Sequence, residues 1–206
     1  MAQIDLNTAR IAVGHYNGVD APLSYGDTAA ELAELRSGCG VFQLGWRGLV
    51  TVAGKDRVRW LHNMTTNNVR DLAAGRGVYA FVLNHQGRIL GDMTIYNLGE
   101  SLLLETDRSQ IEPLLTTMKR YIIMDKVDLA DARDRFTAIG VCGPRSQDVL
   151  AKAGFNVNGM EPLEVREQDV NGLKCRIIRG GEQKPGWYEL WSSPEDSQRL
   201  SDGLHL

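Results

Sequence analysis

The sequence repeats one order of secondary structure, and this constrains the fold more than any other feature. From residue 48, apolar spacing predicts a strand, a short helix, three strands, a helix and a closing strand near 126–129. A second run starts with a strand at 136–141 and continues with a helix, three strands and a helix toward residue 206. Two similar α+β halves packed together explain this order better than one doubly wound parallel sheet.

Short sequence signals predict where individual elements begin and end. Thr28-Ala-Ala-Glu31 has the spacing of a capping box, so we expect a helix to begin there and to end at Gly38. Gly143-Pro144 predicts another helix, with proline at its first position. Asn171-Gly172 lies between two apolar segments and is a strong signal for a hairpin. Helical spacing also extends over 109–124.

These elements suggest three parts of the chain. We expect an irregular N-terminal arm over residues 1–27, a first α+β half over 28–131 and a second half over 132–206. The second half has no counterpart of the strand that closes the first. We therefore expect the second sheet to lack a strand and the chain to stop short of the complete fold.

Composition argues against several classes of protein. The 206 residues include 23 basic and 26 acidic side chains without a basic block, so general nucleic-acid binding has no support. No signal-peptide pattern opens the chain, and its longest apolar run, 78–83, is far below the roughly 20 residues of a bilayer span. Three scattered cysteines and four scattered histidines form no metal-binding pattern, so we expect reduced thiols, a cytoplasmic location and no metal site.

Asp92 is the most informative polar residue of the predicted strands. It lies in the middle of an apolar strand, where a carboxylate is costly unless it is solvated or paired. One interpretation is a partly exposed aspartate that accepts a nearby hydrogen bond. The other is a carboxylate that lines a pocket beside Gly91, where the missing side chain leaves room for a flat ligand.

Aromatic residues with polar neighbours occur at two further places. Tyr79 with Asn84, and Trp187-Tyr188-Glu189, combine aromatic faces with hydrogen-bonding groups. They suit either core aromatics with a strand-end glutamate, or the walls of a site for a fused-ring ligand with N–H donors. Three arginines are expected on a solvated face: Arg47, Arg57 and Arg59.

Six segments in a fixed order carry a resemblance to a known family. They are Leu35-Arg-Ser-Gly-Cys-Gly-Val-Phe42, Val52-Ala-Gly-Lys-Asp-Arg-Val-Arg-Trp-Leu61, Thr66-Asn-Asn-Val69, Tyr79-Ala-Phe-Val-Leu-Asn84, Gly87-Arg-Ile-Leu-Gly-Asp92 and Tyr121-Ile-Ile-Met-Asp-Lys-Val127. From about residue 28 to about residue 195, the chain resembles the glycine-cleavage T-protein (aminomethyltransferase) superfamily. Within it, the chain is most similar to the bacterial folate-binding branch linked to iron–sulfur protein maintenance and tRNA modification.

The resemblance implies a fold, a cofactor and a set of site residues. The fold is the aminomethyltransferase folate-binding domain, with two ferredoxin-like β-α-β-β-α-type halves and without the family's C-terminal β-barrel. The cofactor is tetrahydrofolate. Asp92 matches the second acid of the family's acidic pair and would be both catalytic and cofactor-binding. Tyr79 and Asn84 match the strand and turn before it, and Glu189 matches a glutamate that reads the pterin edge.

Departures from the T-protein pattern separate the alternatives. Leu44-Gly-Trp-Arg47 stands where the T-protein has Ser-His, Gly91 stands at the first acid of its pair, and the branch's Lys-Gly-Cys motif does not occur. The resemblance therefore implies a tetrahydrofolate-binding protein acting in one-carbon or iron–sulfur maintenance chemistry, with a folate and a protein client as partners. One alternative is an aminomethyltransferase that moves a methylene unit from an aminomethyl-lipoyl carrier to tetrahydrofolate. The other is a non-catalytic scaffold that retains the fold.

Overall fold

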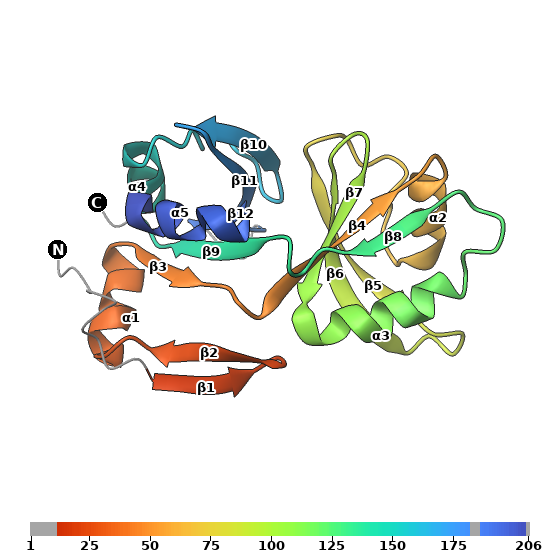
Figure 1. Ribbon diagram of the computed structural model, residues 1–206, viewed down its shortest axis with the longest axis horizontal. Helices are drawn as coiled ribbons and strands as arrows, with labels where there is room; N and C mark the ends of the chain where they lie inside the picture. Colours follow the sequence, from red (N-terminus) through yellow and green to blue (C-terminus); the bar gives the residue numbers. More distant parts are fainter. Residues whose placement is uncertain (1–11, 182–185, 205–206) are drawn as a thin grey trace. The chain divides into compact units, whose positions relative to one another are not determined.

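The computed structural model describes residues 12–181 and 186–204, and its contacts divide the chain into two compact units (Figure 1). Unit 1 comprises Met1–Trp46, Thr137–Pro162 and Arg166–Leu206, and unit 2 comprises Arg47–Phe136 and Leu163–Val165. Among the described residues, no helix is long and apolar enough to cross a membrane. In the same residues, no three His, Cys, Asp or Glu side chains are grouped so that they could hold a metal ion.

Unit 2 is a five-stranded antiparallel sheet in the order β5-β6-β7-β4-β8 with two helices. Its elements are β4 (Arg47–Ala53), α2 (Arg57–Met64), β5 (Gly77–Leu83), β6 (Ile89–Asn97), β7 (Leu102–Asp107), α3 (Arg108–Lys119) and β8 (Asp128–Asp131). The strands expected from the sequence are present here, and the expected helix over 109–124 is shorter because it ends at Lys119.

The two faces of the unit 2 sheet differ in chemistry. Side chains alternate along a strand, so Met93 and Ile95 of β6 share one face, where they join a buried apolar cluster with Leu61 of α2 and Ile111 of α3. The opposite face receives the alternate residues of β6, among them Asp92. The apolar face therefore makes the core, and the polar face is left to carry the candidate site.

Unit 1 contains a second five-stranded antiparallel sheet, in the order β10-β11-β12-β9-β3, and a separate two-stranded hairpin. Its elements are β1 (Ala12–Tyr16), β2 (Val19–Ser24), α1 (Thr28–Ser37), β3 (Gly40–Gln43), β9 (Thr137–Cys142), α4 (Ser146–Lys152), β10 (Val165–Val170), β11 (Leu173–Arg179), β12 (Trp187–Ser192), the 3-10 helix η1 (Pro194–Asp196) and α5 (Ser197–Leu204). The expected α+β class is confirmed, since both sheets are antiparallel and both are combined with helices.

The expectation that the second sheet lacks a strand is wrong. β3 pairs with β9 at the sheet edge, and this is the place that β8 takes beside β4 in unit 2. The strand comes from far upstream and has only four residues, too few to show a periodicity in the sequence. Because β3 belongs with the second sheet, the units also divide at 46/47 and 136/137, whereas the expected halves divide at 131/132.

The expected irregular arm is wrong for residues 12–24, which form the β1–β2 hairpin. Its turn is Asn17-Gly18, and both residues have positive φ, 46° and 85°. Asn-Gly is the pair that such two-residue turns favour, so the sequence did contain the signal. Residues 1–11 of the expected arm lie outside the described residues.

Helix α1 is capped by Asp27, one residue before the cap that the sequence suggested. The Asp27 carboxylate accepts from the backbone N–H groups of Ala29 (2.9 Å) and Ala30 (3.2 Å). Glu31 instead accepts from the backbone N–H of Tyr25 at 2.8 Å, so it fixes the chain that enters the helix. The expected helix at Gly143-Pro144 likewise begins later, at Ser146, because Gly143 has a φ of 132° that is not helical.

The cap makes a local prediction. Asp27→Ala should weaken the first turn of α1 by about 1 kcal/mol, because two backbone donors lose their acceptor. Amide hydrogen exchange at Ala29 and Ala30 should then accelerate about fivefold. Thr28→Ala serves as the control, and equal acceleration in both variants would mean that Asp27 is not the cap.

Candidate functional site

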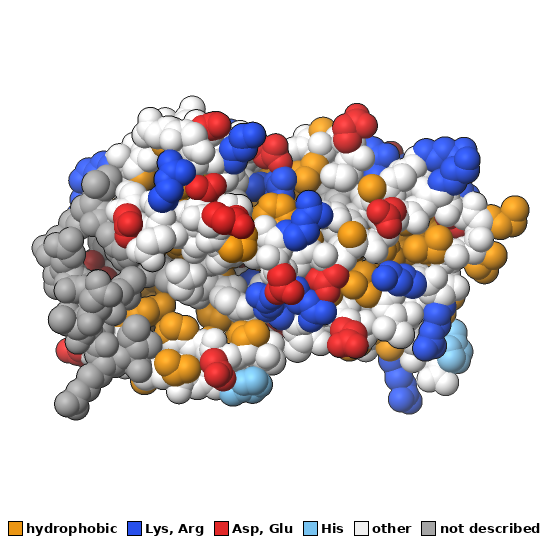
Figure 2. Space-filling view, in the orientation of Figure 1, with side chains coloured by type: hydrophobic (Ala, Val, Ile, Leu, Met, Phe, Trp, Pro, Cys, Tyr) orange, Lys and Arg blue, Asp and Glu red, His pale blue; other side chains and the backbone are white. Residues whose placement is uncertain are grey.

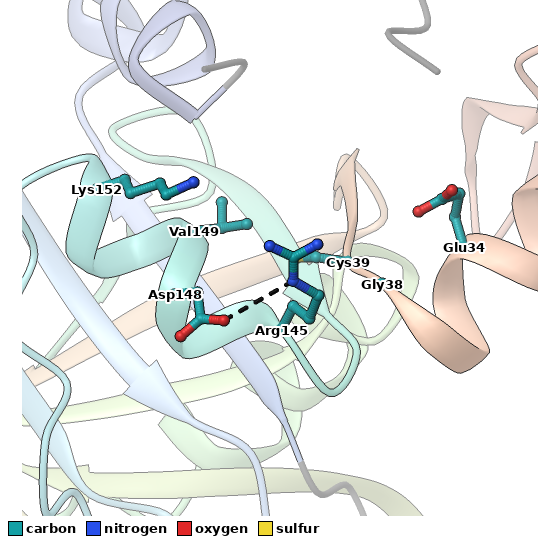
Figure 3. Close-up of a pocket in the computed structure, with 7 residues that line it drawn as sticks. All are labelled: Glu34, Gly38, Cys39, Arg145, Asp148, Val149 and Lys152. Carbon is teal, nitrogen blue, oxygen red and sulfur yellow. Dashed lines mark ion pairs between the residues drawn. The ribbon is translucent and has the colours of Figure 1, made fainter. Parts of the chain in front are cut away.

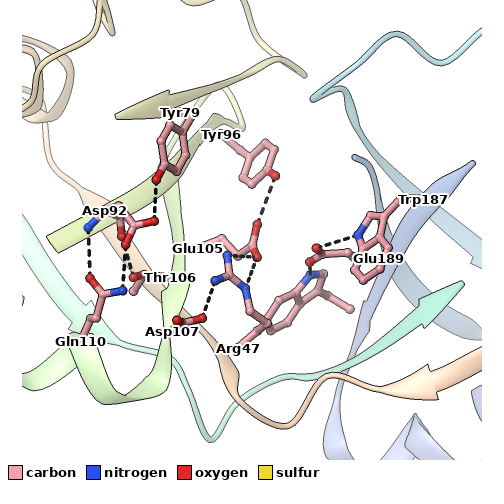
Figure 4. A network of polar contacts seen from close by, with 11 residues as sticks. Arg47, Tyr79, Asp92, Tyr96, Glu105, Thr106, Asp107, Gln110, Trp187 and Glu189 are labelled. Atoms are coloured by element: carbon pink, nitrogen blue, oxygen red, sulfur yellow. Dashed lines mark hydrogen bonds and ion pairs between the residues drawn. The ribbon is translucent and has the colours of Figure 1, made fainter. Parts of the chain in front are cut away.

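The candidate site is the Asp92 carboxylate of unit 2, which is half-buried and held by three other elements of that unit (Figure 4). Tyr79 of β5 donates its hydroxyl to Oδ2 at 2.7 Å. Gln110 of α3 donates Nε2 to Oδ1 at 2.8 Å, and its Oε1 accepts from the backbone N–H of Asp92 at 3.0 Å. Thr106 of β7 donates to the backbone carbonyl of Asp92 at 2.7 Å. Backbone and carboxylate are therefore both fixed.

These contacts keep Asp92 ionised. Burial raises the pKa of Asp92, but the hydrogen bonds from Tyr79 and Gln110 and the charge of Arg47 outweigh burial and hold it below the ordinary value of 3.8. Burial, followed by the hydrogen bond and the charge of Asp92, raises the pKa of Tyr79 to about 12, so this phenol stays a donor. A carboxylate has about four lone-pair sites, so Asp92 can still accept from N–H donors of a ligand.

The expected room for a ligand beside Gly91 is wrong, because α3 fills it. A Cβ atom placed on Gly91 would lie 2.6 Å from Oε1 of Gln110 and 2.9 Å from Cδ2 of Leu114. The missing side chain thus allows α3 to approach β6 closely, and it leaves no space on that face for a flat molecule.

Asn84 lies in the turn between β5 and β6. Its Oδ1 accepts from the backbone N–H groups of Gln86 and Arg88, each at 2.9 Å, and the turn is completed by Gly87 with a φ of 78°. The structure therefore brings Tyr79 and Asp92 into direct contact and gives Asn84 hydrogen bonds that shape the hairpin. A role of Asn84 in ligand binding stays a prediction.

A second polar cluster on unit 2 was missed by the sequence analysis. Glu105 of β7 is buried, with 2% of its surface exposed, and it pairs with Arg47, whose Nε lies 2.6 Å from Oε1. Arg47 also bonds to Asp107 at 2.6 Å, and Tyr96 donates its hydroxyl to Glu105 at 3.2 Å (Figure 4). An acid after Leu102-Leu-Leu, inside a buried strand, was the signal that a cation or hydrogen-bond donors must compensate it.

The expectation of a solvated arginine face is therefore wrong for Arg47, whose side chain is only 23% exposed. Arg57 is half-buried and donates to the carbonyl groups of Gly54 and Gly99. Arg59 fits the expectation, since its side chain is 63% exposed and pairs with Asp125 at 2.6 Å.

Glu189 belongs to unit 1, where it lies in the middle of β12 rather than at a strand end. It is 6% exposed and accepts from two indole N–H groups, Trp187 at 3.0 Å and Trp191 at 3.2 Å (Figure 4). Each oxygen thus has one neutral donor. The role of Glu189 in ligand binding stays a prediction.

A hollow in unit 1 lies between the end of α1 and helix α4 (Figure 3). Arg145 and Lys152 face it together with Glu34 and Asp148, so its charges balance and favour no charged ligand. Cys39 also lines it, and burial followed by the nearby Cys142 raises the pKa of the Cys39 thiol to about 11. A thiol of this kind is a weak nucleophile at neutral pH, and we assign no chemistry to the hollow.

Comparisons with known proteins all point to one family. The family described as the GCVT N-terminal domain matches residues 6–205. The aminomethyltransferase of Bacillus subtilis is 27% identical over 188 residues, covering 90% of this chain and 52% of its own, and that of Bacillus velezensis is 29% identical with coverages of 90% and 51%. The chain therefore spans about half the length of these curated relatives.

Solved structures support the fold. The glycine cleavage system aminomethyltransferase T from Bartonella henselae superposes with a TM-score of 0.86 at 21% identity, covering 96% of this chain and 54% of that one. A heterotetrameric sarcosine oxidase from Corynebacterium sp. U-96 gives a TM-score of 0.60 at 15% identity, with coverages of 86% and 88%. At these identities the likeness concerns the fold alone.

The Arg47–Glu105 pair makes a prediction about stability. Arg47→Met should lower the free energy of unfolding of unit 2 by about 3 kcal/mol, because Glu105 loses the cation that compensates its burial. Arg59→Met, at an exposed ion pair of the same unit, should cost less than about 1 kcal/mol. Native-state hydrogen exchange of the β7 amides measures both, and similar losses would contradict a special role for Arg47.

The lowered pKa of Asp92 predicts how stability depends on pH. Folding favours the ionised carboxylate, so its contribution is present above the ordinary pKa of 3.8 and is lost as the pH falls through the lower folded value. Asp92→Asn should therefore flatten the acid limb of the unfolding free energy of unit 2. The exposed Asp128, changed to Asn in the same unit, should leave that limb intact.

Proposed function

Because the chain belongs to the GCVT N-terminal domain family, we propose that it binds tetrahydrofolate, with Asp92 as the acceptor for N–H donors of the ligand. The observation that carries the proposal is the Asp92 carboxylate itself, half-buried, ionised and fixed by Tyr79 and Gln110. An ionised acceptor of this kind suits a nitrogen-rich ring that presents N–H groups.

The residues around Asp92 fit a flat ligand with such groups. The Tyr79 side chain is 46% exposed, so its ring offers an aromatic surface next to the carboxylate it bonds. The family resemblance adds Asn84, and Glu189 of unit 1, to the proposed folate-binding residues. Asn84 has an amide nitrogen to donate, and the Glu189 carboxylate is a hydrogen-bond acceptor.

Within this function, we propose that the protein acts in folate-linked one-carbon chemistry or in iron–sulfur protein maintenance, with a client protein as partner. The observation in favour is the crowding at Gly91, where Gln110 and Leu114 occupy the space that a second acid would need. A single acid with an amide partner is a weaker proton-transfer device than a pair of acids with separated pKa values.

The alternative function is transfer of a methylene unit from an aminomethyl-lipoyl carrier to tetrahydrofolate. The names of the relatives favour it, since the proteins matched over half their length are aminomethyltransferases. Asp92 would then hold the reacting amine and stabilise the positive charge that develops on it. Most of the rate gain would come from holding the two reactants together. A scaffold without a ligand is the third alternative.

Calorimetric titration with tetrahydrofolate under anaerobic conditions tests the proposal. Wild-type protein should bind saturably, and Asp92→Ala should weaken binding at least tenfold, because a charge-assisted hydrogen bond contributes about 1.5–3 kcal/mol. Asp128→Ala, which removes an exposed carboxylate from β8, is the matched control. Equal affinities in all three proteins would remove Asp92 from the site, and no binding would support the scaffold.

A turnover assay separates the first function from the aminomethyltransferase alternative. Protein that binds tetrahydrofolate is mixed with an aminomethyl-lipoyl carrier, and the release of ammonia is followed. The first function predicts binding without ammonia release, whereas the aminomethyltransferase predicts release that stops in Asp92→Ala.

A further inference from the structure

We propose that Gln110 is the positioning residue of the Asp92 site, because its amide binds both the backbone and the carboxylate of Asp92 and so orients the acceptor. The inference rests on the proposed function only for the identity of the ligand. Gln110 reaches Asp92 from the first turn of α3 and belongs to none of the site residues expected from the sequence.

The geometry is a two-point contact between one amide and one residue. Oε1 of Gln110 accepts from the Asp92 backbone N–H at 3.0 Å, and Nε2 donates to Asp92 Oδ1 at 2.8 Å. Because the amide binds the backbone and the side chain of the same residue, it restricts the side chain about χ1 and the carboxylate about χ2. A flipped amide would place Oε1 against Oδ1, so the hydrogen bonds permit one amide orientation.

The missing side chain of Gly91 leaves the space that the Gln110 amide occupies. A Cβ on Gly91 would lie 2.6 Å from Oε1 of Gln110, closer than a carbon can approach without displacing the amide. Leu114, one turn further along α3, limits the room for that displacement, since its Cδ2 would be 2.9 Å from the same Cβ. The contact of Gln110 with Asp92 therefore depends on a glycine at position 91.

Gln110 controls one of the two carboxylate oxygens. Tyr79 donates to Oδ2, whereas Gln110 donates to Oδ1, and the charge of Arg47 acts on the carboxylate as a whole. The amide is uncharged and does not titrate near neutral pH, so its donor is present at any working pH. A ligand thus meets a fixed anion, which accepts N–H donors and repels carbonyl oxygens.

The test measures the proton affinity of Asp92 directly, by a ¹³C NMR titration of its carboxyl carbon. Gln110→Met keeps the side-chain length but removes the donor, so the proton affinity of Asp92 should rise about tenfold. Gln110→Glu adds a like charge beside Oδ1, and the rise should be larger still. Tetrahydrofolate affinity should fall about tenfold in Gln110→Met, measured by calorimetry.

A matched control is available in unit 1. Gln198 donates Nε2 to Asp202 at 2.7 Å on the exposed face of α5, so Gln198→Met removes the same kind of hydrogen bond elsewhere. It should change neither the titration of Asp92 nor folate binding. Gly91→Ala removes no polar group but displaces the Gln110 amide, so it should also raise the proton affinity of Asp92.

The outcomes separate this inference from the proposed function. If Asp92 titrates alike in wild type, Gln110→Met and Gln110→Glu, Gln110 is structural and the inference fails, whatever the affinity for folate. If the titration shifts as expected but wild-type protein does not bind tetrahydrofolate, the positioning role stands and the proposed ligand is wrong.

Discussion

The interactions of the Arg47 guanidinium with nearby acids determine the polar face of the unit 2 sheet. Arg47, the first residue of β4, pairs with the buried Glu105 and with Asp107, which lies directly opposite in the register, and its charge also lowers the pKa of Asp92. A buried carboxylate such as Glu105 is costly unless an opposite charge or hydrogen-bond donors compensate it. Because Arg47 compensates these acids, Glu105 can be buried and Asp92 can remain an anion at the surface.

The stretch that runs from the end of β7 into α3 supplies most of the groups that bond to Arg47 and Asp92. Glu105, Thr106, Asp107 and Gln110 come within six residues, and each bonds to Arg47 or to Asp92. A strand places alternate residues on opposite faces, and the helix that follows at once brings the next side chains back over the strand end. The end of β7 and the first turn of α3 therefore fix both the buried ion pair and the half-buried Asp92 acceptor. The stability of unit 2 and the geometry of its site thus depend on the same short stretch of chain.

Local signals in the sequence were sufficient for much of the fold. Hairpin β5–β6, helix α2 and the hairpin after Asn171-Gly172 follow from apolar spacing and turn residues, and the contact of Tyr79 with Asp92 follows from two neighbouring strands. Interactions between distant segments were not predictable in this way. β3 pairs with β9, a strand about a hundred residues later in the chain. Arg47 and Glu105 come from two neighbouring strands that are far apart in the sequence. The space at Gly91 is filled by side chains of the later helix α3.

The two sheets share a strand order but treat their buried acids differently. β7 and β12 take the third place in their sheets, and each carries a buried glutamate, Glu105 and Glu189. Glu105 is bonded by a guanidinium, whereas Glu189 receives two neutral indole donors. Hydrogen bonds from a cation are about twice as strong as those from a neutral donor, so the two buried acids are compensated by interactions of different strength. The same strand order thus accommodates one buried acid beside a guanidinium and its counterpart between two indole N–H donors.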